Sequence, residues 1–357
     1  MADRKRVTIR DVAEATGLAL STVSNALAGK DYVREETRAL VNEAAVRLGY
    51  RASAVARALR MQRSFAIGVL IADVANPSSA DFVRGVEDVA LAEKCSLFLC
   101  NTDGDEEKQL WHMRTLIDRQ VDGMVLISQH CSSPAVRQLL DGRTPFVLVQ
   151  RRNKAFADDY VGSDNVAGLT EALRHLHDIG HRRIGFVRGP ADSSSAHERL
   201  DTFQKQVRVL GLHTDPELVF AGDYTFSTGY AAGNYFLDMK HPPTAVFGSS
   251  DMNSMGVMEA AFARGLEIPR DLSVVGLDDI SLAGFRLINL TTVRLRKREM
   301  GAAAATLLMR RIRGNKDPVR ELIYPTNLII RGSTCPPAAP EKPAPKTRNK
   351  ARRSEYS

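Results

Sequence analysis

The chain has 357 residues, of which 44% are hydrophobic and 25% charged, as expected of a globular protein with two or three domains. No run of about 18 apolar residues predicts a transmembrane helix, and the N-terminus MADRKRVTIRD lacks the apolar segment of a signal peptide. The formal net charge of +7 is concentrated at the two ends: residues 1–63 hold 12 Lys+Arg against 7 Asp+Glu, and residues 335–357 hold 6 against 2. That distribution is expected of a nucleic-acid-binding segment joined to a nearly neutral sensor domain.

The first predicted elements lie between Thr8 and Leu27, in the stretch TIRDVAEATGLALSTVSNAL. Thr8 followed three residues later by Asp11 predicts a helix N-terminus with reciprocal capping. Gly17 can adopt a left-handed conformation and end that helix. The apolar spacing then predicts helices at about 9–16 and 20–28, arranged either as a DNA-binding helix-turn-helix or as an ordinary two-helix corner.

A third amphipathic helix is predicted over 34–48 and ends before Gly49. Its apolar positions recur every three or four residues and should cover the first two helices; they are Leu40, Val41, Ala44, Ala45 and Leu48. A core of this size, in about 50 residues, is marginally stable on its own.

Residues 64–334 alternate short β-branched runs with amphipathic stretches, which predicts parallel sheets wrapped by helices. The expected strands are 66–72, 96–101, 123–128, 146–150, 183–189, 244–250 and 273–278. The expected helices include 81–93, 107–119, 165–179, 197–210 and 252–264. About 270 residues are more than one sheet usually serves.

The last stretch, 335–357, is rich in Pro, Ala, Lys and Arg and is expected to be disordered. It is interpreted as an inert tail or, alternatively, as a source of non-specific DNA affinity. It has no leucine heptads, so no helical tetramerisation bundle is predicted.

Nothing in the sequence indicates an enzyme, a cofactor or a metal site. The four cysteines form no C-x-x-C pair and are expected to be reduced thiols of a cytoplasmic protein. His175 and His177 lie two residues apart and do not share a helix face, so a metal site there is not predicted. The sequence also lacks the Gly-rich, nucleophile-elbow and zinc-protease motifs.

Several short sequence motifs occur in an order and spacing that are typical of a known family. They include DVAEATG, STVSNALAG, VREETRALV, LGYRASAVARALR, IGVLIADVANP, GHRRIGFVRGP, GDYTFSTGY and SVVGLDDI. Over roughly residues 7–334 the chain resembles the LacI/GalR family of bacterial transcriptional regulators.

The resemblance implies an α/β protein whose all-α helix-turn-helix headpiece precedes a core like that of a periplasmic sugar-binding protein. The headpiece would be 1–50, the hinge helix 51–63, the core 64–334 and the tail 335–357. The core would contain two subdomains of parallel sheets wrapped by helices, with crossings near 161, 291 and 321. The N-subdomain would then be about 64–160 and 292–320, and the C-subdomain about 161–291 and 321–334, with a ligand cleft at the strand ends between them.

In this family the first residues of the second helix contact base edges, and these positions are Leu20, Ser21 and Asn25 here. Asn can pair with adenine, and Leu can meet a thymine methyl. Thr22 and Ser24 are expected to contact phosphate or to cap the helix, with a solvated polar face as the alternative. Arg10, Lys30 and Arg51 are expected phosphate contacts, and Thr8 is a further expected DNA contact.

Two cap positions depart from the family pattern, which has Ser where this chain has Ala19 and Arg34. Each change removes a side-chain acceptor for helix N–H groups, at a cost of about 1 kcal/mol. We therefore expect a headpiece less stable than that of a typical member.

The hinge segment RASAVARALR has Ala52 and Ser53 where the family has Pro and Asn. Ser53 can cap the hinge helix, and small residues such as Ala56 allow two hinge helices to approach in a dimer. The resemblance makes Leu59 the apolar wedge in the minor groove. The alternative is a plain linker helix with Leu59 packed on the core.

The resemblance also implies the lining of the effector cleft: Ser78, Ser79, Gln150, Arg199, Tyr224, Ser250 and Asp278. Arg and Asp at these positions suit a sugar or sugar acid through charge-assisted hydrogen bonds. The alternatives are a surface salt bridge for Arg199, a loop cap for Asp278 and a core aromatic for Tyr224.

The sequence around these positions predicts an unusual cleft. Ser78 and Ser79 replace two aromatic residues common in the family, and Gln150 replaces a common Asp before Arg151 and Arg152. We therefore expect a roomier, less aromatic and more basic pocket, suited to a sugar acid, a phosphorylated sugar or a disaccharide.

The function predicted from these observations is an effector-controlled repressor that binds a near-palindromic operator as a homodimer, without membrane contact. Effector binding would change the closure of the two subdomains and so the hinge. A solute-binding protein and an enzyme are the rival hypotheses. The missing signal peptide and the basic headpiece argue against the first, and the absence of a catalytic constellation argues against the second.

Overall fold

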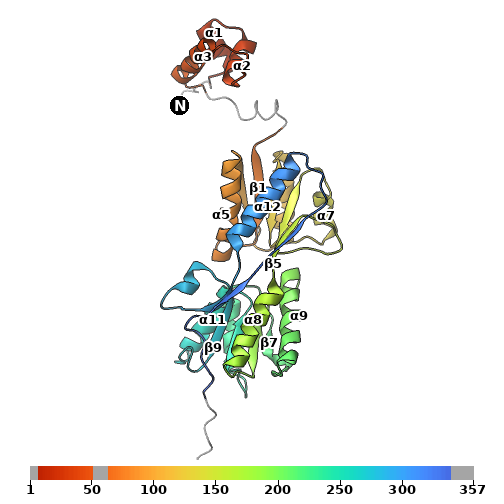
Figure 1. Ribbon diagram of the computed structural model, residues 1–357, viewed down its shortest axis with the longest axis vertical. Helices are drawn as coiled ribbons and strands as arrows, with labels where there is room; N and C mark the ends of the chain where they lie inside the picture. The colour runs from red at the N-terminus through yellow and green to blue at the C-terminus, as the bar shows by residue number, and fades with distance from the viewer. Residues whose placement is uncertain (1–6, 51–62, 339–357) are drawn as a thin grey trace, which may run out of the picture. The chain divides into compact units, whose positions relative to one another are not determined.

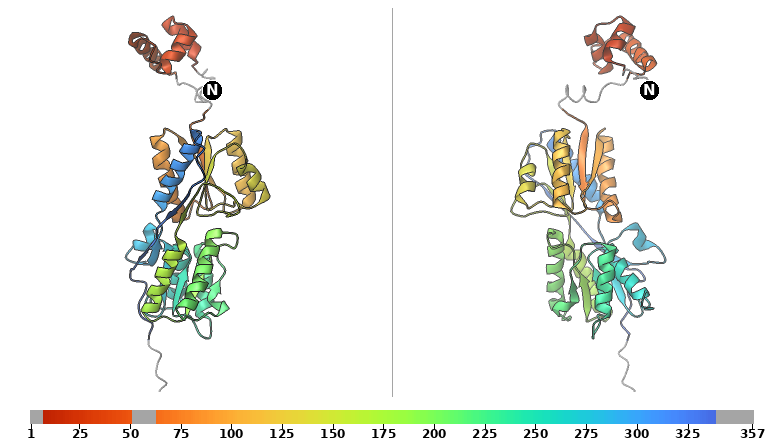
Figure 2. Two further views of the ribbon diagram at one scale, coloured as in Figure 1. Left: turned by 45° about the vertical axis from the view of Figure 1, so that its right-hand side comes forward. Right: turned by 180° about the vertical axis from the view of Figure 1, so that it is seen from behind.

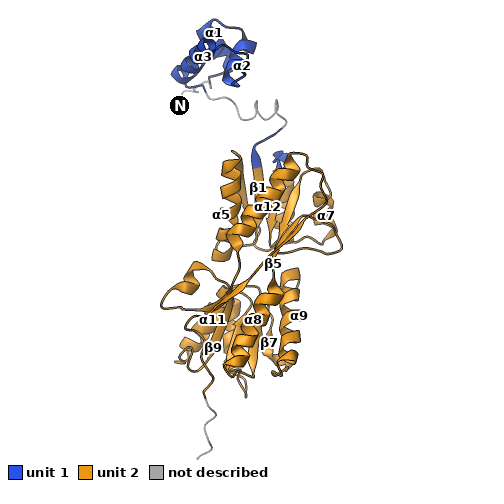
Figure 3. Ribbon diagram, in the orientation of Figure 1, with its two compact units in different colours: residues 1–66, 118–122 blue, residues 67–117, 123–357 orange. Residues whose placement is uncertain are grey.

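The computed structural model describes residues 7–50 and 63–338. The chain divides into two compact units, which Figure 3 colours separately: residues 1–66 with 118–122, and residues 67–117 with 123–357. No helix in the described ranges is long and apolar enough to cross a membrane.

The first unit contains three helices, α1 (Ile9–Thr16), α2 (Leu20–Leu27) and α3 (Glu35–Leu48). At the start of α1 the Asp11 carboxylate accepts hydrogen bonds from the backbone N–H of Thr8 at 2.6 Å and from its hydroxyl at 2.9 Å. Gly17 ends α1 in the left-handed region, with φ 67°. The predicted helices and the turn between them are therefore present.

The core of this small unit is formed by one face of each helix. Its fully buried side chains are Val12, Val23, Ala26, Val41, Ala44 and Ala45. We expected Leu40 in this core, and that prediction is wrong, because 48% of its surface remains exposed. Leu40 has the sequence spacing of a core residue, but it lies on the side of α3 that faces solvent.

The second unit contains two six-stranded sheets (Figure 1). The first sheet has the strand order β11-β5-β4-β3-β1-β2. Its strands are β1 (Ala66–Ile71), β2 (Ser96–Asn101), β3 (Gly123–Ile127), β4 (Phe146–Val149), β5 (Tyr160–Ser163) and β11 (Glu321–Tyr324). The pairs β1–β3, β3–β4, β4–β5 and β5–β11 are parallel.

Helices cover both faces of this first sheet (Figure 2). They are α5 (Pro77–Ala92), α6 (Glu106–Asp118), α7 (Pro134–Leu140) and α12 (Lys297–Ile312). The backbones of α5 and α12 pack so closely that a Cβ at Gly85 would lie 2.0 Å from the Arg298 carbonyl oxygen. The burial of every residue of β1 explains why its sequence is a continuous apolar run.

The second sheet has the order β12-β10-β9-β8-β6-β7. Its strands are β6 (Ile184–Val187), β7 (Val219–Phe220), β8 (Ala245–Gly248), β9 (Ser273–Asp278), β10 (Thr291–Arg294) and β12 (Asn327–Ile329). The pairs β6–β7, β6–β8, β8–β9 and β9–β10 are parallel, and β12 runs antiparallel to β10. Two buried clusters lie in this half of the unit; α8 (Asn165–Asp178) and α9 (Ser194–Val209) contribute to one, and α10 (Phe226–Leu237) and α11 (Asp251–Phe262) to the other.

The chain crosses between the two sheets three times, and each crossing lies a few residues later than predicted. Residues 160–163 and 321–324 are strands of the first sheet, and residues 291–294 are a strand of the second. The crossings therefore fall between β5 and α8, between β10 and α12, and between β11 and β12. The assignment of 321–324 to the C-subdomain was wrong, because β11 pairs with β5.

The C-terminal segment is fixed to the second sheet beyond the predicted start of the tail. The carbonyl oxygen of Cys335 accepts hydrogen bonds from Nε2 of His181 at 2.9 Å and from the Ser273 hydroxyl at 3.1 Å. The backbone N–H of Cys335 also donates to that hydroxyl oxygen at 3.0 Å. The expectation of disorder from 335 onward is therefore wrong at Cys335, and residues from 339 lie outside the described range.

Candidate functional site

The first candidate site is the outer face of the three-helix unit. Thr8, Arg10, Leu20, Ser21 and Lys30 are exposed, and Thr22, Ser24 and Asn25 are partly exposed. Leu20 keeps 45% of its surface exposed although it is a large apolar side chain at the start of α2. An exposed leucine beside hydroxyl and amide groups suits contact with base edges better than contact with a protein core.

The two predicted cap defects are present in this unit. Ala19 precedes α2 and Arg34 precedes α3, and neither side chain makes a capping hydrogen bond. The predicted hinge and DNA contacts Arg51, Ser53, Ala56 and Leu59 lie outside the described residues.

The second candidate site is a cavity of about 600 Å³ at the carboxyl ends of strands from both sheets. All seven residues predicted for the effector cleft line it: Ser78, Ser79, Gln150, Arg199, Tyr224, Ser250 and Asp278. Its size lies within the usual range for small-molecule sites. The structure therefore brings together residues that the sequence separates by up to 200 positions.

Arg199 projects from α9 and is 5% exposed. Its Nε donates to the Asn165 side-chain oxygen at 2.8 Å, and its Nη1 donates to the Ser249 carbonyl at 2.9 Å. Among the described residues no protein group pairs with Nη2, so this nitrogen is free to donate to a ligand. The alternative of a surface salt bridge is wrong, because neither Glu198 nor Asp201 pairs with Arg199.

Asp278 ends β9 and is 7% exposed. Burial raises the pKa of its carboxyl group, whereas the charges of Lys297 and Arg199 and a hydrogen bond from Ser78 oppose that rise. Lys297 is itself buried and donates to the Asp278 backbone carbonyl at 2.8 Å. A buried carboxyl group beside Arg199 can accept hydrogen bonds from two ligand hydroxyls.

Tyr224 lies beside Arg199, whose guanidinium carbon is 5.7 Å from the ring centroid. The Tyr224 hydroxyl is buried without a hydrogen-bond partner in the described part of the chain. The ring packs on Gly189 so closely that a Cβ there would lie 2.2 Å from it. An unpaired buried hydroxyl is costly, which makes this group a candidate to bind a polar ligand.

Ser250 and Gln150 are more strongly engaged with the protein. The Ser250 hydroxyl caps α11 by accepting from the Asn253 backbone N–H at 3.1 Å, and it donates to the Tyr224 carbonyl at 3.3 Å. The Gln150 side-chain oxygen accepts from the Ser163 hydroxyl at 3.0 Å. Both residues therefore shape the cavity wall, and only the Gln150 amide nitrogen remains a ready donor.

The expectation of a basic pocket is wrong. The cavity is lined by five aspartates and two arginines, and one of those arginines, Arg151, forms an ion pair with Asp192. Arg152 does not line this cavity, because it pairs with Glu321 and lies over the Tyr160 ring. Phe82 and Phe226 also line the wall, so aromatic surface remains despite the loss at Ser78 and Ser79.

Sequence reasoning missed several lining residues, above all carboxylates. Asp73, Asp103, Asp192 and Asp223 all face this cavity. Their positions after β1, β2, β6 and β7 follow one rule, since the carboxyl ends of parallel strands meet at one edge. An inspection of the acidic residues just after predicted strands could have found Asp73, Asp103 and Asp192, but not Asp223, because β7 was not predicted.

Comparison with known proteins agrees with this architecture. Residues 8–53 match the model of bacterial regulatory proteins of the lacI family, and residues 173–334 match that of a periplasmic binding protein-like domain. The Ribose operon repressor of Escherichia coli (strain K12) is 34% identical over 329 residues, which cover 91% of this chain and 99% of that protein.

Solved structures show the same fold. The transcriptional regulator CelR in its complex with cellobiose is 30% identical, with a TM-score of 0.70, and the match covers 92% of this chain and 100% of that one. A lac repressor dimer bound to operator and an anti-inducer is 24% identical, with a TM-score of 0.83 over 93% of this chain and 100% of that one.

A helix-turn-helix unit joined to a periplasmic-binding-protein-like pair of sheets defines a transcriptional regulator with an effector-binding domain. The chain belongs to the LacI family of bacterial regulatory proteins. This family comprises non-enzymatic regulators, in agreement with the prediction that the chain is not an enzyme.

Proposed function

We propose that this protein is a repressor that binds its operator as a homodimer and is controlled by a neutral sugar in the cavity between the two sheets. The observation that carries the proposal is the pair formed by Arg199 and Asp278 in a cavity whose other charges are mainly carboxylates. Binding to an operator would place the protein in the cytoplasm.

The DNA-binding half of the proposal concerns α2. Leu20, Ser21 and Asn25 would contact base edges in the major groove, while Arg10 and Lys30 would contact phosphates. Two copies related by a two-fold axis would present two such helices to half-sites of an inverted repeat. Leu59 would insert at the central base step.

The effector half departs from the expectation of an anionic ligand. A phosphate or carboxylate would meet Asp73, Asp103, Asp223 and Asp278 with only Arg199 free to pair with it. Like charges at short range disfavour binding, whereas ligand hydroxyls can donate to these carboxylates and accept from Arg199. The named relatives fit this class, since one is a ribose operon repressor and one was solved with cellobiose.

The effector half is tested by calorimetry of the full chain with three matched pairs of compounds. The pairs are D-ribose and ribose 5-phosphate, glucose and gluconate, and cellobiose and cellobionate. We expect the neutral member to bind more tightly wherever a pair binds at all. Tighter binding of a phosphate or an acid would overturn the neutral-sugar assignment.

The DNA half is tested by selecting genomic fragments with the purified protein and sequencing them. We expect one inverted repeat, with half-sites separated in a manner that fits two α2 helices. Recovery of only non-specific, salt-sensitive DNA, with and without the sugars above, would contradict a sequence-specific repressor.

A further inference from the structure

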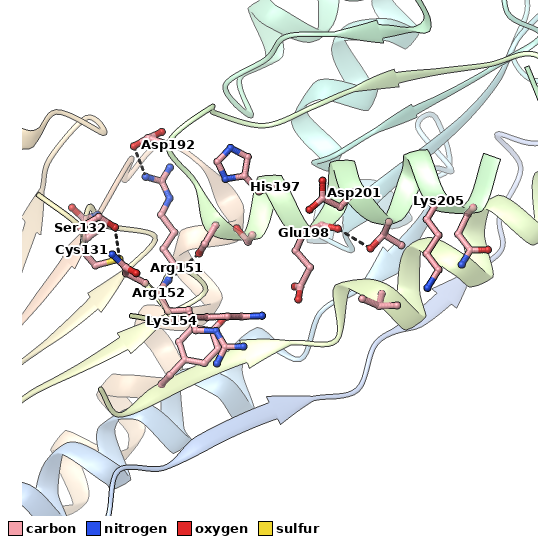
Figure 4. A pocket seen from close by; sticks show the side chains of 18 residues that line it. Cys131, Ser132, Arg151, Arg152, Lys154, Asp192, His197, Glu198, Asp201 and Lys205 are labelled. Atoms are coloured by element: carbon pink, nitrogen blue, oxygen red, sulfur yellow. Dashed lines mark hydrogen bonds and ion pairs between the residues drawn. The ribbon is translucent and has the colours of Figure 1, made fainter. Parts of the chain in front are cut away.

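One side of the effector cavity is closed by an ionic contact between the two halves of the second unit. Arg151 follows β4 of the first sheet, and its Nη1 lies 3.1 Å from Oδ2 of Asp192, which precedes α9 on the second sheet (Figure 4). The same Asp192 oxygen lies 2.9 Å from Nδ1 of His130, which follows β3. We call these three residues the clasp.

A backbone contact reinforces the clasp. The N–H of Arg152 donates to the Ser194 hydroxyl at 2.9 Å, again from the first sheet to α9. The backbone of His130 is fixed by the Gln109 side chain, which makes two hydrogen bonds to it, at 2.8 and 2.9 Å. Arg151 and His130 are thus fixed on one subdomain, and Asp192, which both of them contact, stands on the other.

The clasp is also a wall between two cavities. A second cavity of about 600 Å³ lies on its far side, between the loops after β3 and β4 and the exposed face of α9, and it shares Arg151 and Asp192 with the effector cavity. Cys131 lines this second cavity beside His130 and is 5% exposed. Separation of the subdomains on this side would therefore open the wall and expose Cys131.

Charge burial makes the clasp sensitive to one residue. The Arg151 side chain is 8% exposed, its Nε has no partner in the described residues, and Asp192 is its only acidic partner there. Asp192 is 46% exposed, so only the arginine of this pair is buried. Removing Asp192 alone leaves the buried guanidinium uncompensated, which is more costly than removing both members. Without Asp192, separation of the subdomains would rehydrate the Arg151 guanidinium.

We propose that Asp192, Arg151 and His130 are positioning residues that hold the effector cavity closed and so set the balance between the open and closed forms. The consequence for effector and operator binding rests on the proposed function. The contact itself can be tested without any ligand. Failure of the clasp proposal can therefore be distinguished from failure of the proposed function.

The test measures iodoacetamide alkylation of each cysteine in the full chain by peptide mass spectrometry. Burial raises the pKa of the Cys131 thiol, so the closed form should react slowly. Loss of a half-exposed ion pair should make Asp192→Asn alkylate at Cys131 about tenfold faster. The rates at the buried Cys95 and Cys100 should remain unchanged.

Two further variants separate a clasp from general loosening. In Arg151→Gln/Asp192→Asn no buried charge is left unpaired, so Cys131 should react more slowly than in Asp192→Asn. Asp201→Asn is the matched control, because Asp201 lies on α9 beside the second cavity and forms no ion pair with a described residue. Its Cys131 rate should equal that of the parent protein.

Amide hydrogen exchange provides an independent measurement. The Arg152 N–H should exchange faster in Asp192→Asn, since its bond to Ser194 spans the same boundary. An unchanged Cys131 rate in Asp192→Asn would overturn the proposal. Equal acceleration at Cys95 and Cys100, or a double variant that reacts faster than the single one, would overturn it as well.

Discussion

The two missing helix caps of the headpiece lead to a quantitative prediction. Ala19 and Arg34 have nearly the same backbone conformation, with φ and ψ of −59° and 143° and of −57° and 143°. A serine there can accept a hydrogen bond from an N–H group of the first turn, and such a cap stabilises a helix by about 1 kcal/mol. Arg34→Ser also removes a cation from the positive end of α3, which adds a few tenths of a kcal/mol.

The two substitutions should act independently. They cap different helices and share no partner, so their effects should add to about 2 kcal/mol. Each kcal/mol changes the ratio of folded to unfolded headpiece by about fivefold. Among the described residues, the core of the three helices has only six buried apolar side chains, so that gain would be a large part of the headpiece's stability.

Native-state amide hydrogen exchange on the full chain measures this gain. The amides of Val12, Val23 and Val41 report on the headpiece core, and that of Val125 in β3 serves as an internal standard. Exchange at the headpiece amides should slow by about fivefold for each serine, while the standard is unchanged.

A control substitution distinguishes capping from a general effect of serine. Ala28 follows α2 at its C-terminal end, where a hydroxyl cannot satisfy the N–H groups of the first turn. Ala28→Ser should therefore give no protection. The capping argument fails if Ala19→Ser and Arg34→Ser leave exchange unchanged or accelerate it, or if Ala28→Ser slows it equally.

Three further predictions follow from buried contacts. Arg199→Lys keeps the positive charge but loses the planar guanidinium that hydrogen-bonds to Asn165, so the affinity for sugar in calorimetry should fall at least about tenfold. Unchanged affinity would show that Arg199 does not bind the ligand. Burial lowers the pKa of His181, so below about pH 6.5 this side chain takes up a proton in the unfolded chain but not in the folded one. The free energy of unfolding in urea should therefore fall from pH 7 to pH 5 more steeply than in His181→Gln. Parallel pH dependence of the two proteins would contradict this. Gly229→Ala would place a Cβ 2.0 Å from the Asn253 carbonyl oxygen, so it should destabilise by about 1–3 kcal/mol in a thermal melt; an unchanged melting temperature would contradict the close packing of α10 on α11.

Local sequence patterns predicted those parts of the fold that local forces determine. Ala66–Ile71 is apolar throughout because both faces of β1 are covered, and Gly17 ends α1 because its φ is 67°. Strands β5 and β11 were not predicted, since four residues such as Tyr160–Ser163 have no distinctive period. Their existence depends on pairing with each other and with β4, and this pairing also shifts the crossings.

The same distinction applies to the cavity. Family motifs identified Arg199, within α9, and Asp278, at the end of β9, as lining residues, because both lie in stretches that resemble the family. The charge of the site was mispredicted for two reasons. Arg151 forms an ion pair with Asp192, which lies 41 positions away in the sequence, and Arg152 forms an ion pair with Glu321 and does not line the cavity. Neither pairing leaves a trace in the local pattern of residues.

Backbone strain concentrates at the edge that carries the site. Ser128, Gln150, Tyr224 and Asp278 all line the cavity and have positive φ, from 55° to 134°, although none is glycine. Each such conformation costs of order 1–3 kcal/mol and persists only where surrounding contacts impose it. Gln150 is held by Ser163, and the carbonyl oxygen of Tyr224 accepts from Ser250, so the strain is opposed by hydrogen bonds within each subdomain. The clasp acts between the subdomains at this same edge. A ligand that bonds to Arg199 and Asp278 on the second sheet, and also to Ser78 or Gln150 on the first, would therefore add to the closure that we propose for Asp192.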